Sequence, residues 1–379
     1  MDAVGIIAEY NPFHNGHLYH LNKVKEMFPD SATIIILGGN FMQRGEPSII
    51  NKWDKTKIAL EYGVDLVVEL PFCFATQSGD IFARGGIQLL EHLKVKHLVF
   101  GSESDDIKSL TKLAKEYLKN ENNNIIKDCL DKGYNYPSAL SKGLNNKIKS
   151  PNDILGLCYI KEIMKGNYNI IPITIKRTSN YHNLELTNNI VSASSIRNAL
   201  KNNEDVKNYV PDITYKYLHN TLHFKEDYFN LLKYKILANI NYLDKFQTVD
   251  EGIENRIKKV IVGSTSLEDL INKIKSKRYT HNRIMRMLTH ILTDFTKEEA
   301  QTKKNIEYIR ILGFSDKGKD YLNKIKKDIN IPIISKYSKT DDKLLSLELR
   351  TTSIYASILN EEDKIKLIEA EYKNKPIKK

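Results

Sequence analysis

Two histidines at the end of an apolar run are the strongest candidates for a chemical role in this sequence. His14 and His17 are three positions apart, with Gly16 between them, in the segment Gly5-Ile-Ile-Ala-Glu-Tyr-Asn-Pro-Phe-His-Asn-Gly-His-Leu-Tyr-His20. If the turn already winds into a helix, both imidazoles lie on one face and reach the same anion. The free N–H groups at a helix N-terminus also favour phosphate. The segment therefore predicts a phosphate site where two imidazoles stabilise charge that develops during a displacement.

The residues on either side of the histidines predict the elements that position them. Pro12 ends the apolar strand before the turn, and Gly16 lets a nucleotide approach the backbone closely because it has no side chain. A pair of surface histidines beside a strand is the alternative interpretation, and the combination of strand, glycine and helix favours the phosphate site over it. The helix is predicted from apolar residues at helical spacing, namely Leu18, Leu21, Val24, Met27 and Phe28.

A serine-rich segment much later in the chain adds a second candidate phosphate contact. It reads Val191-Ser-Ala-Ser-Ser-Ile-Arg-Asn-Ala-Leu. Ser194 or Ser195 can cap a helix whose first amides hold phosphate, and Arg197 can neutralise a leaving pyrophosphate. An ordinary helix N-cap is the alternative. The two segments, in this order, resemble the nucleotidyltransferase superfamily, whose members have a His-x-Gly-His after the first strand of a parallel sheet and expel pyrophosphate from a nucleoside triphosphate.

Length and composition set the broad class. A chain of 379 residues with 41% hydrophobic and 28% charged residues is long enough for a sizeable core and for two domains or more. Cys73, Cys129 and Cys158 are odd in number and have no C-x-x-C spacing, so neither a disulfide framework nor a thiolate metal site is predicted. No run of eighteen apolar residues and no charged leader with an apolar core occurs. We therefore expect a cytoplasmic protein without a membrane segment.

The first half of the chain alternates strand and helix patterns, which predicts an α/β fold with a Rossmann-like parallel sheet. We expect residues 1–204 to form a nucleotidyltransferase-like, ATP-binding catalytic domain and residues 205–379 a mainly helical, basic domain, because strand signals become rare after residue 205. The predicted strands are Ala3–Ala8, Thr33–Leu37, Leu66–Leu70, His97–Phe100 and Ile170–Lys176, and the clearest helices are Lys52–Tyr62, Ile81–Leu93, Ile107–Leu118 and Ile154–Met164.

Positive charge is concentrated in the second half. Lys plus Arg exceed Asp plus Glu by about 2 over residues 1–200 and by about 9 over residues 201–379, within a net charge of +11. A basic window without any acidic residue is typical of a surface that binds a polyanion, and a solvated helix face is the alternative. In a helix over 283–292, Arg283, Arg286 and His290 fall opposite the apolar stripe. The window contains Lys273, Lys275, Lys277, Arg278, Arg283 and Arg286.

Further short motifs occur in a fixed order along the chain. They are Phe41-Met-Gln-Arg-Gly-Glu-Pro47, Glu69-Leu-Pro71, Phe100-Gly-Ser-Glu103, Pro151-Asn-Asp-Ile-Leu-Gly156, Lys176-Arg177 with Tyr181-His182, and Lys277-Arg-Tyr-Thr280 followed by Arg283, Met287 and His290-Ile-Leu292. In this order they resemble the bacterial tRNA(Met) cytidine acetate ligase family, and the resemblance runs from residue 3 to about residue 292. It implies an enzyme that activates acetate with ATP as acetyl-adenylate and acetylates the wobble cytidine of elongator tRNA(Met).

The resemblance also implies site residues. ATP contacts are expected from Ile7, Ala8, Glu9, Tyr10, Asn11, Pro12, Phe13, His14, Asn15, Gly16, His17, Leu18, Tyr19, His20, Gly101, Asn152 and Arg177, with Ser194 and Ser195 at the phosphates. The same side chains fit that chemistry: Gly101 leaves room for a nucleoside, Asn152 offers a donor and an acceptor, and Arg177 can meet phosphate. The alternatives are a strand-end turn, a helix N-cap and a solvated charge.

Activation of acetate by ATP requires side chains that position the substrates and supply positive charge, and little else. An acetate carboxylate is already a nucleophile at neutral pH, so the first step requires no general base. We assign stabilisation of the phosphorus centre and of pyrophosphate to His14, His17 and Arg197, with Mg²⁺ bridging phosphate oxygens and no protein ligand named for it. The cytidine must be unstacked from its loop before its amine attacks. Contacts to the tRNA backbone are expected from Lys277, Arg278, Arg283 and Arg286.

Two other functions remain open from sequence. One is a small-molecule adenylyltransferase of coenzyme synthesis, against which the chain length and the basic second half argue. The other is a nucleic-acid-binding protein whose nucleotide site is not catalytic. Formation of pyrophosphate and acetyl-adenylate from ATP and acetate separates this last class from an enzyme. No protein partner is implied.

Overall fold

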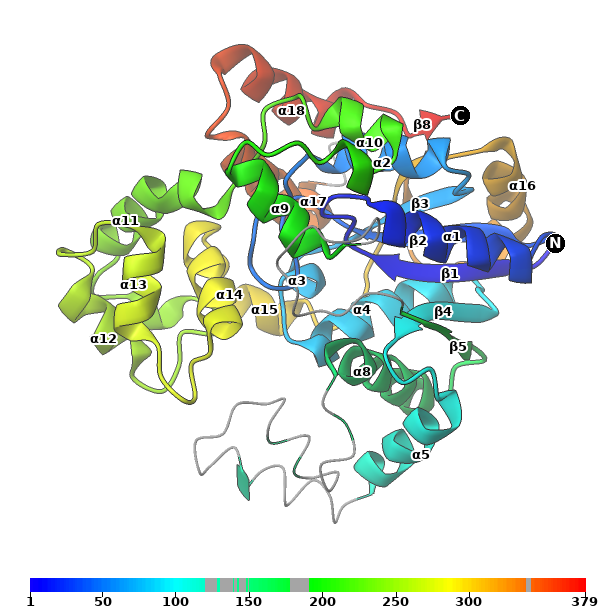
Figure 1. Cartoon of the computed structure of the whole chain (residues 1–379), viewed down its shortest axis with the longest axis horizontal. Coiled ribbons are helices and arrows are strands. Elements are labelled where there is room, and N and C mark those ends of the chain that lie inside the picture. Colours follow the sequence, from blue (N-terminus) through cyan, green and yellow to red (C-terminus); the bar gives the residue numbers. More distant parts are fainter. Residues whose placement is uncertain are drawn as a thin grey trace.

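The apolar runs of the first half form the parallel part of one sheet (Figure 1). Among the described residues the strand order is β5-β4-β1-β2-β3-β6-β7, with β8 beside β6. Strands β1 to β5 pair with one another in parallel, which confirms the predicted α/β class. The bounds are β1 (Ala3–Ala8), β2 (Ala32–Gly38), β3 (Leu66–Leu70), β4 (His97–Ser102), β5 (Ile171–Lys176), β6 (Ile309–Phe314), β7 (Ile333–Ile334) and β8 (Ile377–Lys378).

This computed structural model describes residues 1–119, 128–129, 139, 142, 148, 150–177, 191–338 and 342–379. The motif residues Tyr181 and His182 lie outside the described residues. None of the helices in these ranges is long and apolar enough to cross a membrane.

The helices of the first part lie where the sequence predicts them. Strand β2 is buried along its whole length, as expected for a parallel strand covered on both faces. Helix α4 packs closely on β1, because a Cβ at Gly86 would come within 2.5 Å of Ile7 and one at Gly5 within 2.5 Å of Leu90. The helices are α1 (Asn15–Met27), α2 (Lys52–Glu61), α3 (Phe72–Ala75), α4 (Gly79–His92), α5 (Ile107–Leu118), α8 (Pro151–Gly166) and α9 (Ala193–Lys201).

The strand order places a binding crevice beside β1. The chain passes from β1 to β2 and β3 on one side and then crosses back to β4 on the other side. In such sheets ligands bind at the carboxyl ends of the strands where the direction of winding reverses. His14 follows β1 and Gly101 lies near the end of β4, so both predicted site segments meet at this point.

A second hydrophobic core lies beside the sheet in helices α11 to α14 (Figure 1). It is formed by residues between Phe229 and Ile291. Helix α14 connects this second core to the sheet region, because the Thr289 hydroxyl donates a hydrogen bond to the Gly45 carbonyl (2.5 Å). The helices of this region are α10 (Asp212–Tyr217), α11 (Phe229–Ala238), α12 (Ile253–Val260), α13 (Leu267–Ile274), α14 (His281–Leu292) and α15 (Lys297–Thr302), with short 3₁₀ turns at Lys207–Tyr209, Lys225–Tyr228 and Leu243–Lys245.

After α15 the chain returns to the sheet, which the sequence pattern does not predict. Strand β6 pairs antiparallel with β3, and Leu312 belongs to the same core as the parallel strands. Helices α16 (Asp316–Ile325), α17 (Asp342–Ala356) and α18 (Glu361–Lys373), with a 3₁₀ turn at Lys326–Asp328, follow on this side. The described residues after 205 are mainly helical, and the division into domains at residue 204 stays a prediction. The separate core itself is confined to residues 229–291.

Candidate active site

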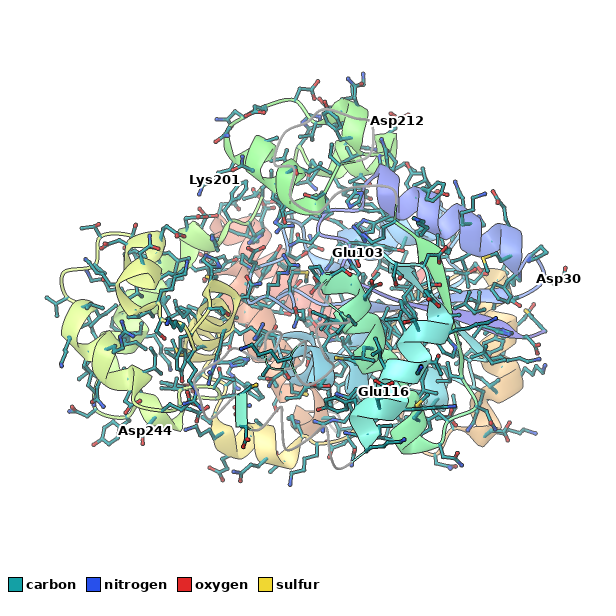
Figure 2. The ribbon with its side chains drawn as sticks, turned by 60° about the horizontal axis from the view of Figure 1, so that its bottom comes forward. Asp30, Glu103, Glu116, Lys201, Asp212 and Asp244 are labelled. Carbon is teal, nitrogen blue, oxygen red and sulfur yellow. The ribbon has the colours of Figure 1, made fainter. Side chains whose placement is uncertain are left out.

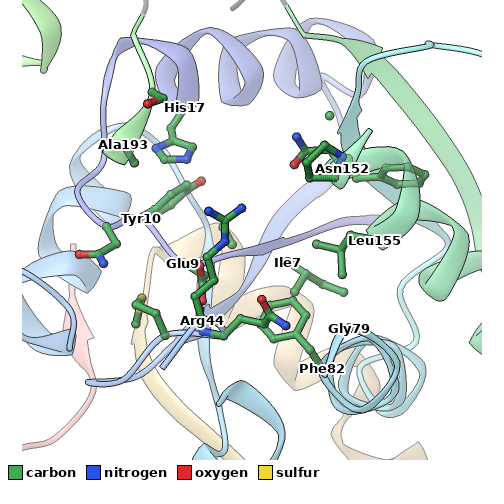
Figure 3. Close-up of a pocket in the computed structure, with 18 of the residues that line it drawn as sticks. Ile7, Glu9, Tyr10, His17, Arg44, Gly79, Phe82, Asn152, Leu155 and Ala193 are labelled. Carbon is green, nitrogen blue, oxygen red and sulfur yellow. Dashed lines mark hydrogen bonds between the residues drawn. The ribbon is translucent and has the colours of Figure 1, made fainter. Parts of the chain in front are cut away.

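A cavity of about 580 Å³ opens at the carboxyl ends of β1, β4 and β5 (Figure 3). It collects residues from five predicted segments that lie far apart in the sequence. Pro12, Phe13, Asn15, Leu18 and Ser195 do not line it. The predicted ATP and catalytic residues that do are Ile7, Ala8, Glu9, Tyr10, Asn11, His14, Gly16, His17, Tyr19, His20, Gly101, Asn152, Arg177, Ser194 and Arg197.

The two imidazoles are held as neutral donors. His14 is the N-cap of α1, and its Nδ1 accepts the amide N–H of Gly16 (3.0 Å). Nδ1 of His17 accepts the amide N–H of His14 (3.3 Å), and the ring centroids are 3.8 Å apart. Burial, with Arg177 and Arg197 nearby, lowers the pKa of His14 to about 3, and burial lowers the pKa of His17 well below its usual value. Each neutral ring therefore carries its proton on Nε2, which can donate to a phosphate oxygen.

The first amides of α1 are less available than the sequence predicts. The amide of Gly16 already donates to His14, and those of His17 and Leu18 donate to the His14 carbonyl. The prediction of a run of free N–H groups here is wrong, because His14 and His17 form a reciprocal cap. The Nε2 atoms, rather than these amides, are the donors that the turn offers to an anion.

Arg197 reaches the cavity from α9 and is held on two sides. Its guanidinium donates to the Asn11 carbonyl (2.8 Å) and to the Glu46 carboxylate (2.7 Å). Burial alone would raise the pKa of Glu46, but Arg197 and other cations hold it below its ordinary value. The helix is capped by Ser192, whose Oγ accepts the Ser195 amide, so neither Ser194 nor Ser195 is the N-cap. Ser194 lines the cavity, whereas Ser195 is buried beneath it.

Replacing Glu46 by Ala is expected to lower acetate-dependent ATP–pyrophosphate exchange by about 10- to 100-fold, because Arg197 loses the carboxylate that fixes its direction. Glu46→Gln, which still accepts a hydrogen bond, should retain more exchange than Glu46→Ala. Equal rates in wild type and both variants would show that Arg197 needs no such support. Thermal unfolding of the variants serves as the folding control.

The opposite end of the cavity can receive a nucleoside. Asn152 Nδ2 donates to Glu103 Oε1 (2.5 Å), and the Asp153 amide donates to Glu103 Oε2 (3.1 Å). Glu103, labelled in Figure 2, thus fixes the start of α8 against the end of β4. Gly101 leaves room there, since a Cβ would lie 3.2 Å from the Arg177 side chain. The N-cap of α8 is Ser150, so Asn152 is not the capping residue.

Helix α14 supplies part of the cavity rim but not in the way its periodicity predicts. Arg286 lines the cavity, and burial lowers its pKa to about 10, with Arg283 and Arg44 adding repulsion. His290 was expected beside the arginines on a polar face. Instead it is fully buried, and its Nε2 lies 2.7 Å from the Thr76 carbonyl oxygen. Both faces of α14 are covered, because the helix lies between its own core and the first part of the chain.

The basic window is partly neutralised by a residue outside it. Arg278 pairs with Glu251 (2.9 Å), and Arg283 lies 3.6 Å from the same carboxylate and 4.0 Å from the Tyr279 ring centroid. Lys277 is exposed. Contacts from Lys277, Arg278, Arg283 and Arg286 to RNA stay predictions.

Several lining residues were not singled out from sequence. The motif 41–47 signals some of them, since Gln43, Arg44 and Glu46 belong to it, but the motif gives no role. The apolar wall has no local signal, because its residues look like ordinary core positions. Lining residues without a predicted role include Met42, Gln43, Arg44, Glu46, Ser78, Gly79, Phe82, Leu155, Cys158, Tyr159, Thr280 and Asn282.

The parallel sheet and the reciprocal histidine cap at its crevice define a nucleotidyl-transferase-type site. The profile of the HIGH Nucleotidyl Transferase family matches residues 1–370. A protein of Geobacillus sp. (strain WCH70), named tRNA(Met) cytidine acetate ligase, is 39% identical over the full length of both chains. The protein of that name from Bacillus subtilis (strain 168) is 37% identical and covers 100% of this chain and 97% of its own.

The crystal structure of Thermotoga maritima TmcAL bound with alpha-thio ATP agrees with these relatives. It superposes with a TM-score of 0.91 at 31% identity and covers 100% of this chain and 99% of its own. The chain belongs to the HIGH nucleotidyl transferase family, among its tRNA(Met) cytidine acetate ligases. The predicted family and fold class are confirmed.

Proposed function

We propose that this protein activates acetate with ATP, releases pyrophosphate, and transfers the acetyl group to the N4 amine of the wobble cytidine of elongator tRNA(Met). The observation that carries the proposal is one cavity of about 580 Å³ that is lined by neutral His14 and His17, by the fixed Arg197 and by Asn152. The names of the full-length relatives support the ligase activity, and the neighbour bound with alpha-thio ATP supports ATP as the nucleotide.

In the first step, residues at one end of the cavity bind the nucleoside and residues at the other end bind the phosphates. Asn152 and Arg177 hold the nucleoside end. The Nε2 donors of His14 and His17 bind phosphate oxygens, where negative charge grows as acetate attacks. Arg197 stabilises the departing pyrophosphate through charge-assisted hydrogen bonds. All of these groups are preset, so little reorganisation accompanies the reaction.

Mg²⁺ is proposed as the companion of ATP, where it would offset the negative charge of the phosphates. In the described parts of the chain no group of three or more His, Cys, Asp or Glu side chains is placed to hold a metal ion. We name no protein ligand for it. A cytoplasmic location likewise stays a prediction.

The decisive assay combines the protein with ATP, labelled acetate and bulk tRNA. We expect labelled N4-acetylcytidine in elongator tRNA(Met), with AMP and pyrophosphate as the other products. Acetate-dependent pyrophosphate exchange without label in tRNA would overturn the transfer step. Absence of both would leave a nucleic-acid-binding protein with a non-catalytic nucleotide site.

The exposed end of the basic window offers a test of the tRNA surface. Lys275 and Lys277 are exposed, whereas Arg286 lines the cavity. Substitution of the two lysines therefore tests RNA binding without altering the cavity. Changing both to Glu should weaken tRNA binding and lower the slope of log K against log salt by about two, since each phosphate contact contributes about one. Filter binding at several salt concentrations measures this. Unchanged binding and slope would make the window a solvated face.

A further inference from the structure

One carboxylate of the predicted ATP-contacting segment has no chemical role in the first step as described above. Glu9 lies at the carboxyl end of β1 and lines the cavity. Its Oε1 accepts the Gln43 amide N–H (2.5 Å), and its backbone carbonyl accepts a bond from the buried Lys55 ammonium (3.0 Å). Figure 3 shows Glu9 at the centre of the cavity, with the Arg44 side chain in front of it. The fold therefore holds an acid and an arginine together at the middle of the cavity.

A carboxylate at this place is a poor partner for either substrate of the first step. Triphosphate and acetate are both anions, and like charges a few ångströms apart repel each other strongly where water is excluded. Arg177, Arg197 and Arg286 also line the cavity, and its other lining carboxylate, Glu46, is paired with Arg197 (2.7 Å). Glu9 instead accepts a backbone amide, from Gln43, and a second carboxylate acceptor among these arginines points to a ligand that brings N–H groups.

The edge of a cytosine base has the complementary pattern. Its N4 amine donates two hydrogens, and its N3 and O2 accept. A carboxylate accepts from N4, while a guanidinium donates to two acceptors at once. Uracil presents the inverse pattern, an acceptor at O4 and a donor at N3. The pair of Glu9 and Arg44 therefore matches cytosine and opposes uracil.

The walls and the rim fit an unstacked base carried by RNA. Ile7, Phe82 and Leu155 form an apolar wall beside the pair, as Figure 3 shows. Bases removed from their stack are held between such side chains. Thr280 and Asn282 line the cavity and lie within the basic window, after Lys277 and Arg278. RNA bound along that window would reach the cavity mouth.

We propose that Glu9 and Arg44 form the subsite for the acceptor cytosine, in which Glu9 accepts the N4 proton and Arg44 donates to N3 and O2. This assignment rests on the proposed function. As N4 attacks the acetyl carbon, an N–C bond forms, the bond from that carbon to the AMP oxygen breaks, and AMP leaves as the anion. One N4 proton passes to Glu9, which then returns it to water.

The surroundings of Glu9 suit a base. Burial raises the pKa of its carboxyl group, although the Gln43 amide and Arg44 act in the opposite direction. A carboxylate with a raised pKa holds a proton more strongly, which favours proton transfer from the attacking amine. The rate of acetyl transfer should fall at low pH as Glu9 becomes protonated. This acid limb should be absent from Glu9→Gln.

The experiment compares the two half-reactions in Glu9→Gln. The glutamine Oε1 still accepts the Gln43 amide, so the local fold is kept. Single-turnover acetyl transfer to tRNA should fall by about 100-fold or more, as for loss of a general base. Acetate-dependent pyrophosphate exchange should fall at least ten times less. Glu46→Ala, which removes the carboxylate bound to Arg197, should lower exchange and should lower transfer only as far as less acetyl-adenylate is formed.

A binding assay tests recognition apart from chemistry. A tRNA transcript with uridine at the wobble position should compete poorly for wild type, and at least tenfold better for Glu9→Gln, whose amide can donate to O4. Equal loss of exchange and transfer, or unchanged discrimination between the transcripts, would overturn the assignment. Wild-type protein without exchange or transfer would instead contradict the proposed function itself.

Discussion

Replacing His17 by Ala is expected to lower acetate-dependent ATP–pyrophosphate exchange by about 100- to 1,000-fold, the effect of removing one preset donor from developing charge. His17 points toward the cavity in Figure 3, and its Nδ1 is occupied by the His14 amide, so Nε2 is the donor available to phosphate. Because the ring is neutral, it contributes an oriented hydrogen bond rather than a full charge. Exchange measured with saturating acetate reports this step without any contribution from tRNA.

The same substitution also removes a structural contact, and this needs a control. His17 caps the His14 amide and packs against the Tyr10 ring at a centroid distance of 4.9 Å. Glutamine is favoured at this third helical position of a capping box, so His17→Gln should keep the start of α1. We expect both variants to lose exchange and only His17→Ala to lose thermal stability. Near-normal exchange in His17→Ala would remove the imidazole from the mechanism.

The structure brings predicted site residues together where they are close in the sequence or follow from the parallel sheet, and their roles stay predictions. The strand, the turn and both histidines lie within one short segment, so local pattern alone brings them together. The serine-rich segment needs only the parallel sheet to place Arg197 opposite that turn. The local sequence pattern does not predict which residue forms a hydrogen bond or ion pair with each site side chain. The bond between Arg197 and Glu46 joins residues 151 positions apart, and no periodicity reports such a contact.

Helix α14 shows how packing overrides a helical wheel. Its spacing separates an apolar face from a polar face, and the latter carries Arg286 and His290. In the structure a Cβ at Gly45 would lie within 2.6 Å of the backbone of Met285 and Arg286, so the loop at 42–47 presses directly on this helix. Gly45 also has a φ of +84°, which favours glycine. The face of α14 that the sequence predicts to be exposed to solvent therefore packs against the loop at 42–47, and this packing places Arg286 at the cavity.

Strand β6 was missed for a related reason. Arg310 interrupts its apolar run, and a charged residue at the second position argues against a buried strand. The side chain is nevertheless only 5% exposed, because its charge is paired with Glu69 (3.2 Å) and Glu371 (2.6 Å). Those partners lie in β3 and α18, so the compensation is visible only after folding.

This buried group of charges leads to the largest expected change in stability. Lys52 completes it, at 2.6 Å from Glu69 and 2.9 Å from Glu371, and all four side chains are at most 5% exposed. Replacing Glu371 by Ala leaves two buried cations facing a single carboxylate. Breaking such a pair by removing one partner is expected to destabilise the fold by about 3–5 kcal/mol. Chemical denaturation of the variant and the wild type measures this difference.

The control lies on the same helix. Glu369 pairs with Lys373 at the surface, where the side chains are 48% and 68% exposed, so Glu369→Ala should leave the denaturation midpoint nearly unchanged. Arg310 and Lys52 hold the pKa of Glu371 below its ordinary value despite burial. Its stabilising contribution is therefore present above the unfolded-state pKa and is lost as pH falls through the folded-state pKa. The wild type should lose stability on acidification more steeply than Glu371→Ala, and equal acid slopes would show that the pairing is not what makes this carboxylate stabilising.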